Sequence, residues 1–341
     1  MAEESHPAYL SPSELGTKDY WESYYARTLA HISHEAPKND PNANDTSDQN
    51  DDDAASTTSD VNEEDDPGTS WFSEHNAPQK VLHFLTRKSF PLSPRNTAHK
   101  KSPRQPSVLD LGTGNGSMLA LLRKRGGYAG RLVGVDYSRQ SVELARELQR
   151  VRGHSAYRSD SEDEDEDESD DEEEAEVETE TKAEAETGSN DLSEHETSIQ
   201  FEEWDILGSK ALLSETGLEV SPSSSSPSEE TLPWFPYQEG GFDIVLDKGT
   251  FDAVSLADDA KTTRVCERYP DIARRLVRRG GFLIVTTCNW TEEELVHWFT
   301  ADRTSGDRFA VWGRVEYPRF RFGGHEGQGV CTVCFQRLGD A

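Results

Sequence analysis

Long apolar stretches are missing from this sequence of 341 residues, which contains no run of about 18 hydrophobic residues. Its N-terminus also lacks the basic and apolar regions of a secretory signal. Hydrophobic residues make up 33% of the chain, below the roughly 45–50% of ordinary globular domains. These absences argue against a membrane-spanning or secreted protein. They predict a soluble protein located in the cytoplasm, with the nucleus as a second location.

Cysteine is scarce as well, and its four residues are too few and too scattered for a disulfide framework. Cys331 and Cys334 have the C-x-x-C spacing of half a zinc site, but the sequence offers no second half. The pair lies in a predicted strand, where residues three apart point to opposite faces. We therefore expect no metal site and interpret these cysteines as core residues.

Basic residues are few compared with acidic ones. The chain has 35 Lys and Arg and 66 Asp and Glu, which give a formal net charge of −31. The excess is local: residues 38–70 carry −10, residues 155–198 carry −19, and everything else sums to −2. A nearly neutral core without a basic, aromatic face argues against nucleic acid as a substrate. The acidic tracts are predicted to be disordered, either as solvated loops or as arms for a basic partner.

Composition also predicts the domain organisation. An N-terminal helical segment in residues 1–36 is followed by a disordered acidic insertion in residues 37–70 and by the main domain in residues 71–341. Two insertions interrupt that domain, an acidic one in residues 155–198 and a loop rich in Ser, Pro and Glu in residues 219–230.

The N-terminal segment is predicted to be helical over residues 15–32, with Thr17 as a suitable N-cap. Four aromatic residues follow at helical spacing: Tyr20, Trp21, Tyr24 and Tyr25. They form either a face that docks on the domain or a lid over a cofactor or substrate.

Buried strands alternate with helices through the main domain. Strands are expected at 107–111, 132–135, 199–205, 242–246 and 282–287, and helices at 80–88, 118–125, 138–152, 259–277 and 291–300. The glycines at 280 and 281 are read as a helix stop. The last two strands, 309–317 and 329–336, have no helix between them and should pair antiparallel. The fold class is therefore α/β: a Rossmann-like, seven-stranded sheet with a C-terminal antiparallel hairpin and helices on both faces.

The stretch from Pro106 to Tyr137 indicates a nucleoside-cofactor site. Its three glycines are residues that tolerate positive φ where a strand turns directly into a helix, and they leave a ligand room to approach the backbone: Gly112, Gly114 and Gly116. The helix that follows offers unpaired N–H groups at its N-terminus. Asp136, at the carboxyl end of the next parallel strand, is suited to bind ribose hydroxyls, with Tyr137 beside it.

Three details favour S-adenosylmethionine over a dinucleotide. The glycines are spaced G-x-G-x-G rather than G-x-G-x-x-G. Asp110 lies at the strand end, where a carboxylate can organise the turn and attract a cationic amino group. The chain also ends in a hairpin instead of a further βαβ half. Adenine is then expected between the second strand and the segment around Asp205, although a short Trp-Asp pair is a weak signal.

Several segments together resemble a known family. In order along the chain they are LGTKDYW, LDLGTGNG, GVDYS, DKGTFDAVSL and CNWT. They are similar to the protein-lysine methyltransferases that modify translation elongation factor 1-alpha, which belong to the seven-β-strand, S-adenosylmethionine-dependent class. The resemblance covers nearly all segments expected to be ordered, and the long acidic insertions depart from the compact family pattern.

The resemblance implies an enzyme that methylates a lysine of elongation factor 1-alpha, using S-adenosylmethionine and acting as a monomer. Asp247, at the carboxyl end of the strand 242–246, is expected both to face the cofactor and to orient the substrate ammonium. Phe251 and Trp290 are expected to form the walls of the lysine slot. Capping of the adjacent turn by Asp247, and ordinary packing of Trp290, remain alternatives.

Two other readings of the function stay open. One is a methyltransferase of small molecules on the same fold. The other is a non-catalytic binding module whose acidic tracts contact a basic partner.

Overall fold

The computed structural model describes residues 7–35, 72, 75–98, 104–157, 198–222, 229–257, 264–301, 306–322, 325–327 and 329–339. The predicted acidic insertion at 37–70 lies outside these residues, as do residues 158–197 of the second insertion and 223–228 of the third. Within the described residues, no helix is long and apolar enough to span a membrane.

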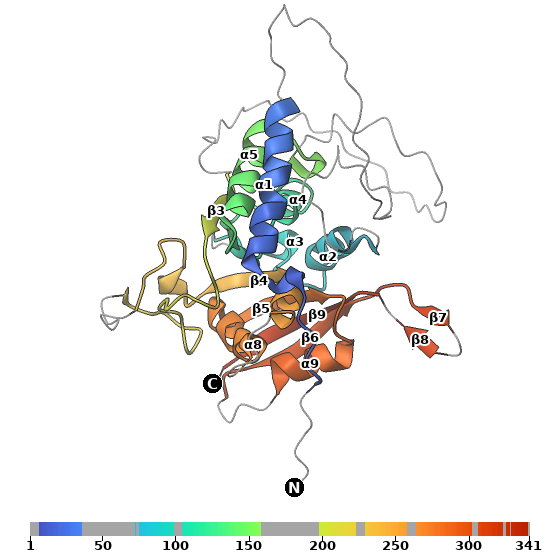
Figure 1. Cartoon of the computed structure of the whole chain (residues 1–341). Helices are drawn as coiled ribbons and strands as arrows, with labels where there is room; N and C mark the ends of the chain where they lie inside the picture. The colour runs from blue at the N-terminus through green and yellow to red at the C-terminus, as the bar shows by residue number, and fades with distance from the viewer. Residues whose placement is uncertain are drawn as a thin grey trace, which may run out of the picture.

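A seven-stranded sheet forms the centre of the molecule (Figure 1). Its strand order is β3-β2-β1-β4-β5-β9-β6, in which all neighbours are parallel except those of β9. The seven-stranded, Rossmann-like fold predicted from the sequence is confirmed. The strands are β1 Val108–Leu111, β2 Leu132–Asp136, β3 Gln200–Glu203, β4 Phe242–Lys248, β5 Val277–Thr287, β6 Arg308–Val315 and β9 Cys331–Leu338.

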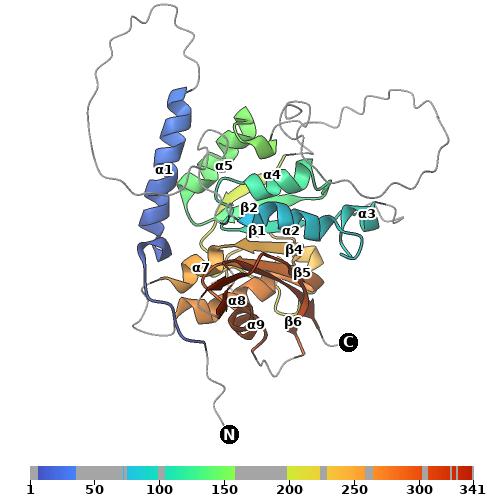
Figure 2. The ribbon, with the colours of Figure 1, turned by 90° about the vertical axis from the view of Figure 1, so that its right-hand side faces the viewer.

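Helices cover both faces of the sheet (Figure 2). The first face carries α1 Lys18–Glu35, α2 Ala77–Thr86, α4 Ser117–Lys124 and α5 Arg139–Val151. The second face carries α7 Thr250–Ser255, α8 Val265–Leu276 and α9 Glu292–Thr300. The shorter elements are η1 Glu14–Gly16, α3 Pro94–Thr97, η3 Ser155–Tyr157, η6 Tyr237–Glu239, β7 Phe320–Phe322 and β8 His325–Gly327.

Successive residues of the inner strands pack into different cores, because side chains alternate across a strand and both faces are covered. Leu109 and Leu111 belong to the core under α7, α8 and α9, whereas Val108 belongs to the core under α2, α4 and α5. The C-x-x-C pair follows the same rule. Cys331 lies in the first of these cores and Cys334 in the second, and both are free thiols, as predicted from their spacing in a strand.

The register of the parallel strands brings the predicted site residues to one edge of the sheet. Leu111 at the end of β1 pairs with Val135 on one side and with Asp247 on the other. The glycine turn after Leu111 therefore lies between Asp136, at the end of β2, and Lys248, at the end of β4. This edge is the place where open α/β sheets bind ligands.

Two predicted boundaries are wrong. The glycines at 280 and 281 do not stop a helix, because α8 ends at Leu276 and β5 begins at Val277. Arg278, the second residue of β5, forms an ion pair with Asp243 of the neighbouring strand β4. This pair accommodates a basic residue near the start of the strand. The second correction concerns residues 155–157, which were predicted to belong to the acidic insertion but form η3 with Ala156 and Tyr157 buried.

One fully buried cation could not be predicted from the sequence. The guanidinium of Arg337 on β9 has no exposed surface and forms a two-point ion pair with Asp307, at 2.8 Å and 2.6 Å. It also donates to four backbone carbonyl groups, those of Ser214, Glu215, Arg274 and Val277. Arg337 thus joins the end of α8 to two loops, and its charge is compensated at every nitrogen.

We expect Arg337→Ala to lower the free energy of unfolding by about 3–5 kcal/mol, because the substitution removes one of the two arginines that bind Asp307 and leaves four backbone carbonyl groups without their buried donor. Urea unfolding followed by circular dichroism measures the effect. The matched control is Arg139→Ala, which removes an ion pair of a side chain that is 70% exposed and is expected to destabilise the protein far less. Equal losses in the two variants would contradict the role given to Arg337.

Candidate functional site

A cavity opens at the carboxyl edge of the parallel strands and encloses about 1060 Å³, its open mouth included. Ligand pockets of proteins commonly measure roughly 300–1,000 Å³. Its walls come from the glycine turn, from the ends of β2 and β4, from the segment after β3, from α7 and from the N-terminal helix. The lining residues of the first three groups include Gly112, Gly114, Asp136, Tyr137, Asp205 and Lys248.

The glycine turn has the geometry that its sequence predicts. Gly112, Gly114 and Gly116 have φ values of 60°, 56° and 75°, a region that residues with a Cβ rarely adopt. Gly112 and Gly114 line the cavity, and Gly112 also has no room for a Cβ beside the Thr250 hydroxyl. Gly116 does not line the cavity. It is the N-cap of α4, and a Cβ there would overlap the rings of Phe201 and Tyr157.

Asp136 organises the wall opposite α7. One of its oxygens accepts hydrogen bonds from the backbone N–H of Gly114 at 3.1 Å and from the Ser141 hydroxyl at 2.8 Å. The other accepts from the backbone N–H of Ser138 at 2.9 Å. A carboxylate has about four acceptor positions, so one position remains for a hydroxyl in the cavity. Burial raises the pKa of Asp136, and these hydrogen bonds partly offset that rise.

Asp110 lies beneath the turn rather than in the cavity wall. Its side chain is 3% exposed and accepts a hydrogen bond from the Thr113 hydroxyl at 2.9 Å. Burial raises the pKa of Asp110 to about 6, although the charge of Lys248 opposes the rise. Asp110 therefore holds the turn through its hydrogen bond with Thr113. Its carboxyl group lies beneath the turn and changes between the neutral and the charged form near pH 6.

The second wall of the cavity contains Tyr137 and Asp205, as predicted. The Tyr137 hydroxyl donates to the backbone carbonyl of Thr17 at 3.1 Å, so this side chain is tied to the N-terminal segment. One Asp205 oxygen accepts from the backbone N–H groups of Leu207 and Gly208, both at 3.0 Å. Asp205 thereby shapes the loop after β3, which supplies apolar lining residues that the sequence did not single out: Trp204, Ile206 and Leu207.

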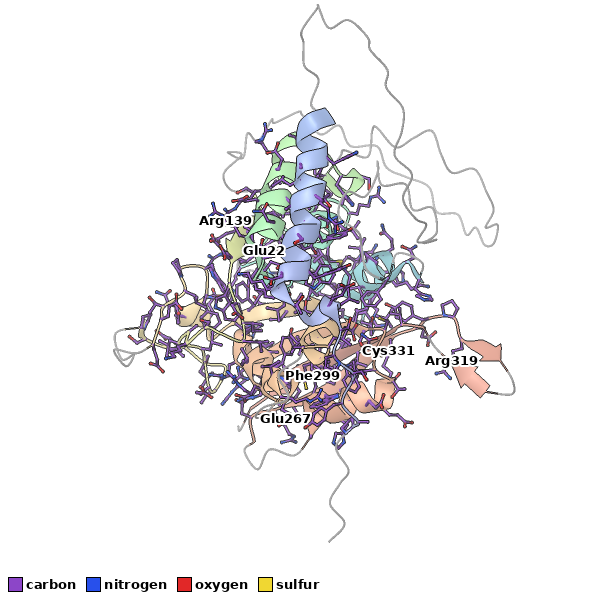
Figure 3. All side chains as sticks on the ribbon, in the orientation of Figure 1. Glu22, Arg139, Glu267, Phe299, Arg319 and Cys331 are labelled. Atoms are coloured by element: carbon purple, nitrogen blue, oxygen red, sulfur yellow. The ribbon has the colours of Figure 1, made fainter. Side chains whose placement is uncertain are left out.

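The N-terminal helix α1 forms part of the site. Trp21 and Tyr25 line the cavity, so the lid interpretation of these aromatic residues fits the geometry. Glu22 fixes the helix from outside, because its carboxylate accepts from the backbone N–H groups of Arg139 at 3.0 Å and Gln140 at 3.3 Å at the start of α5. Figure 3 shows Glu22 and Arg139 side by side on the two elements.

The predicted catalytic residues are not brought into the cavity lining. One Asp247 oxygen caps α7 by accepting from the backbone N–H groups of Thr250 and Phe251, at 2.9 Å and 3.1 Å. The other oxygen accepts from the buried Tyr269 hydroxyl at 2.7 Å. Phe251 is 0% exposed, and Trp290 stacks on it at 6.0 Å between ring centroids. The geometry favours the capping and packing alternatives over contact with a reacting group.

The residues present fit a nucleoside cofactor with a cationic end. The turn has no Cβ atoms at Gly112 and Gly114, and Asp136 retains acceptor capacity beside it. Asp110 and Asp136 are both buried carboxyl groups whose pKa is raised by desolvation, and neither has a salt-bridge partner among the described residues. A nearby positive charge would favour their ionised forms.

Comparison with known proteins agrees with this site. A family model described as a methyltransferase domain matches residues 104–173, the range that contains the glycine turn and Asp136. Protein-lysine N-methyltransferase EFM4 of Saccharomyces cerevisiae is 29% identical over 330 residues, covering 96% of each chain. EEF1A lysine methyltransferase 2 of Homo sapiens is 24% identical, covering 96% of this chain and 88% of its own.

A further relative and a solved structure complete the comparison. Protein-lysine N-methyltransferase efm4 of Schizosaccharomyces pombe is 26% identical, covering 96% of this chain and 95% of its own. The crystal structure of the N-methyltransferase NodS from Bradyrhizobium japonicum aligns with 78% of this chain at 12% identity and a TM-score of 0.34, covering 99% of its own. That structural likeness is too weak to support a functional conclusion.

The fold and the site together define a Rossmann-like methyltransferase. Within that class, the chain is similar over 96% of its length to the protein-lysine N-methyltransferases EFM4 and EEF1A lysine methyltransferase 2, in agreement with the resemblance seen in the sequence.

The burial of Asp247 predicts a pH dependence of stability, which its hydrogen bonds to α7 and Tyr269 partly offset. Burial raises the pKa of Asp247 to about 7, so between about pH 4 and about pH 7 the folded protein holds a proton that the unfolded chain releases. The unfolding free energy should therefore fall as the pH rises through this range. Asp247→Asn cannot titrate, and we expect a shallower fall in urea unfolding across the same range. Identical pH slopes in the two proteins would contradict the assignment.

Proposed function

We propose that this protein is an S-adenosylmethionine-dependent protein-lysine N-methyltransferase and that its substrate is translation elongation factor 1-alpha. The single observation that supports it most is the cavity at the carboxyl edge, where a glycine turn and a buried acid meet in a chain related to lysine methyltransferases over 96% of its length. The substrate is suggested by the name of the relative EEF1A lysine methyltransferase 2. The monomeric state and the cytoplasmic location stay predictions.

In the proposed site, Asp136 holds the ribose, and the turn at Gly112 and Gly114 lies against the amino-acid end of the cofactor. S-adenosylmethionine supplies an electrophilic methyl group on a sulfonium. Asp110 contributes a negative charge from beneath the turn. Trp204, Ile206 and Leu207 offer apolar surface suited to the adenine ring.

The acceptor lysine has to lose its proton before it can attack, and its unperturbed pKa is about 10.4. Two features of the lining favour the neutral amine. Apolar residues such as Val254 and Ala257 disfavour the charged form by desolvation, and the charge of Lys248 lowers the pKa of a neighbouring ammonium by repulsion. Because Asp247 does not line the cavity and its oxygens accept from α7 and Tyr269, the proton is released to water through the open mouth instead of to that carboxylate.

Binding of the cofactor should depend on Asp110 and Asp136. We expect Asp136→Asn and Asp110→Asn to weaken the affinity for S-adenosylmethionine about 10-fold or more, since each change removes a negative charge near the ligand. In the wild type, the affinity should also fall as the pH drops below about 6, because Asp110 then becomes protonated. Isothermal titration calorimetry measures both effects.

Asp19→Asn serves as the control for these variants, because Asp19 is an exposed acid on α1 and does not line the cavity. Wild-type affinity in both site variants, with their folds intact, would contradict the site.

The activity itself is tested by incubating the protein with labelled S-adenosylmethionine and purified elongation factor 1-alpha. We expect label on lysine of that protein, and less label at limiting S-adenosylmethionine when Asp136 is replaced by Asn. A parallel reaction with a lysate of cells lacking this protein tests the substrate. Label that appears only on small molecules or RNA would overturn the proposal.

A further inference from the structure

Different sides of the short helix α7 make different contacts. Thr250, Ala253 and Val254 line the cavity. Asp252 and Ser255, which lie on other sides of the same helix, are buried and bind the segment 287–290 that follows β5. Three of its residues belong to the CNWT motif of residues 288–291, but neither the proposed cofactor site nor the cavity lining uses them.

Asp252 holds the segment by its backbone and by one side chain. Its carboxylate is 0% exposed and accepts from the backbone N–H groups of Cys288 at 3.1 Å and Asn289 at 3.3 Å. It also accepts a hydrogen bond from the Thr287 hydroxyl. A charged, buried acceptor with three donors from consecutive residues fixes their backbone strongly.

A second anchor closes the segment at Trp290. Its indole N–H donates to the Ser255 hydroxyl at 3.3 Å, and that hydroxyl donates to the carbonyl of Phe251 at 2.6 Å. The Cys331 thiol donates to the carbonyl of Trp290 at 3.5 Å. In Figure 3, Cys331 lies at the end of β9, close to this corner of the sheet. The segment is thus held from both ends of α7 and from β9.

Between these anchors, two residues face outward. Cys288 and Asn289 are both exposed, although every residue from Phe282 to Thr287 is buried. Burial of its sulfur beside Asp252 raises the pKa of the Cys288 thiol to about 12, so a thiolate nucleophile is excluded there. The side-chain amide of Asn289 makes no hydrogen bond to the described residues. It offers one acceptor and two donors to a partner.

The position of Asn289 relative to the cavity follows from chain connectivity. Gly249, a lining residue, donates its backbone N–H to the carbonyl of Thr286 at 3.0 Å. Asn289 follows Thr286 by three residues, which span at most about 10 Å of extended chain. The exposed amide therefore lies within reach of a substrate whose lysine side chain enters the cavity.

We propose that Asn289 binds the peptide backbone flanking the acceptor lysine, and that Asp252 is the positioning residue that holds Asn289 in place. The inference rests on the proposed function, since it assigns the substrate side of the same site. An amide suits this task, because a peptide presents a carbonyl acceptor and an N–H donor that match both halves of the group. The hydrogen bonds from Asp252 and Ser255 of α7 explain why the exposed residues of this segment keep one conformation.

The test compares steady-state kinetics of three variants with elongation factor 1-alpha as substrate. We expect Asn289→Ala to raise KM for the protein substrate about 10-fold, with kcat changed less than about 3-fold and the affinity for S-adenosylmethionine unchanged. Asp252→Asn should raise the same KM, because the N–H groups of Cys288 and Asn289 bind different oxygens of Asp252, and the NH2 of the amide would face one of them as a second donor. Thr287→Val removes a single donor and provides a milder variant if Asp252→Asn does not fold.

Two controls make the outcome decisive. Glu293→Gln changes an exposed residue of α9 just beyond the segment and should leave KM unaltered. The double variant Asp252→Asn/Asn289→Ala should be no worse than Asp252→Asn alone, because both act through one contact. Additive effects would contradict the positioning role, and an unchanged KM in Asn289→Ala would overturn the proposal. If the wild-type protein itself does not methylate elongation factor 1-alpha, the proposed function is wrong.

Discussion

One contact between neighbouring strand ends determines the shape of the site. The Thr250 hydroxyl, at the start of α7, donates to the carbonyl of Leu111 at 2.6 Å. The contact is possible because Gly112 has no Cβ where that hydroxyl lies. It joins the turn after β1 to the turn after β4. The glycine turn and α7 therefore cannot move independently, and the remaining walls are arranged around this pair.

Four carboxyl groups lie buried along the same edge: Asp110, Asp136, Asp247 and Asp252. Desolvation is the first cause of the raised pKa of each. Backbone N–H groups bind three of them: those of Gly114 and Ser138 bind Asp136, those of α7 bind Asp247, and those of the segment after β5 bind Asp252. Asp110 instead accepts from a side chain, the Thr113 hydroxyl. It is the group of the four with the most to gain from a cationic ligand.

The sequence predicted the features that are determined locally. The glycine turn has its expected positive φ values, and the Ser138 N-cap and the Thr291–Glu294 capping box are equally local features, because each depends on residues within a few positions of one another. The seven strands and the antiparallel pairing of the last two also followed from the alternation of strands and helices.

The direction of side chains at the sheet edge could not be predicted in the same way. A strand pattern places Asp247 at the correct edge, but it does not tell whether the carboxylate faces the cavity or turns back onto its own helix. That choice depends on Tyr269, which lies 22 residues away and needs an acceptor in the core. Arg337 illustrates the same limit, since its partner Asp307 and its carbonyl acceptors come from three separate parts of the chain.

The N-terminal helix has a consequence for where the folded unit begins. Trp21 and Tyr25 supply part of the cavity wall, and Glu22 caps α5, so a chain cut at residue 71 would lack a wall of its own site. A ligand that fills the cavity contacts residues separated by more than two hundred positions, from α1 to α7. Because the ligand binds only when both α1 and the domain are folded, its binding energy stabilises the two together. As long as the ligand stays bound, α1 therefore unfolds together with the domain.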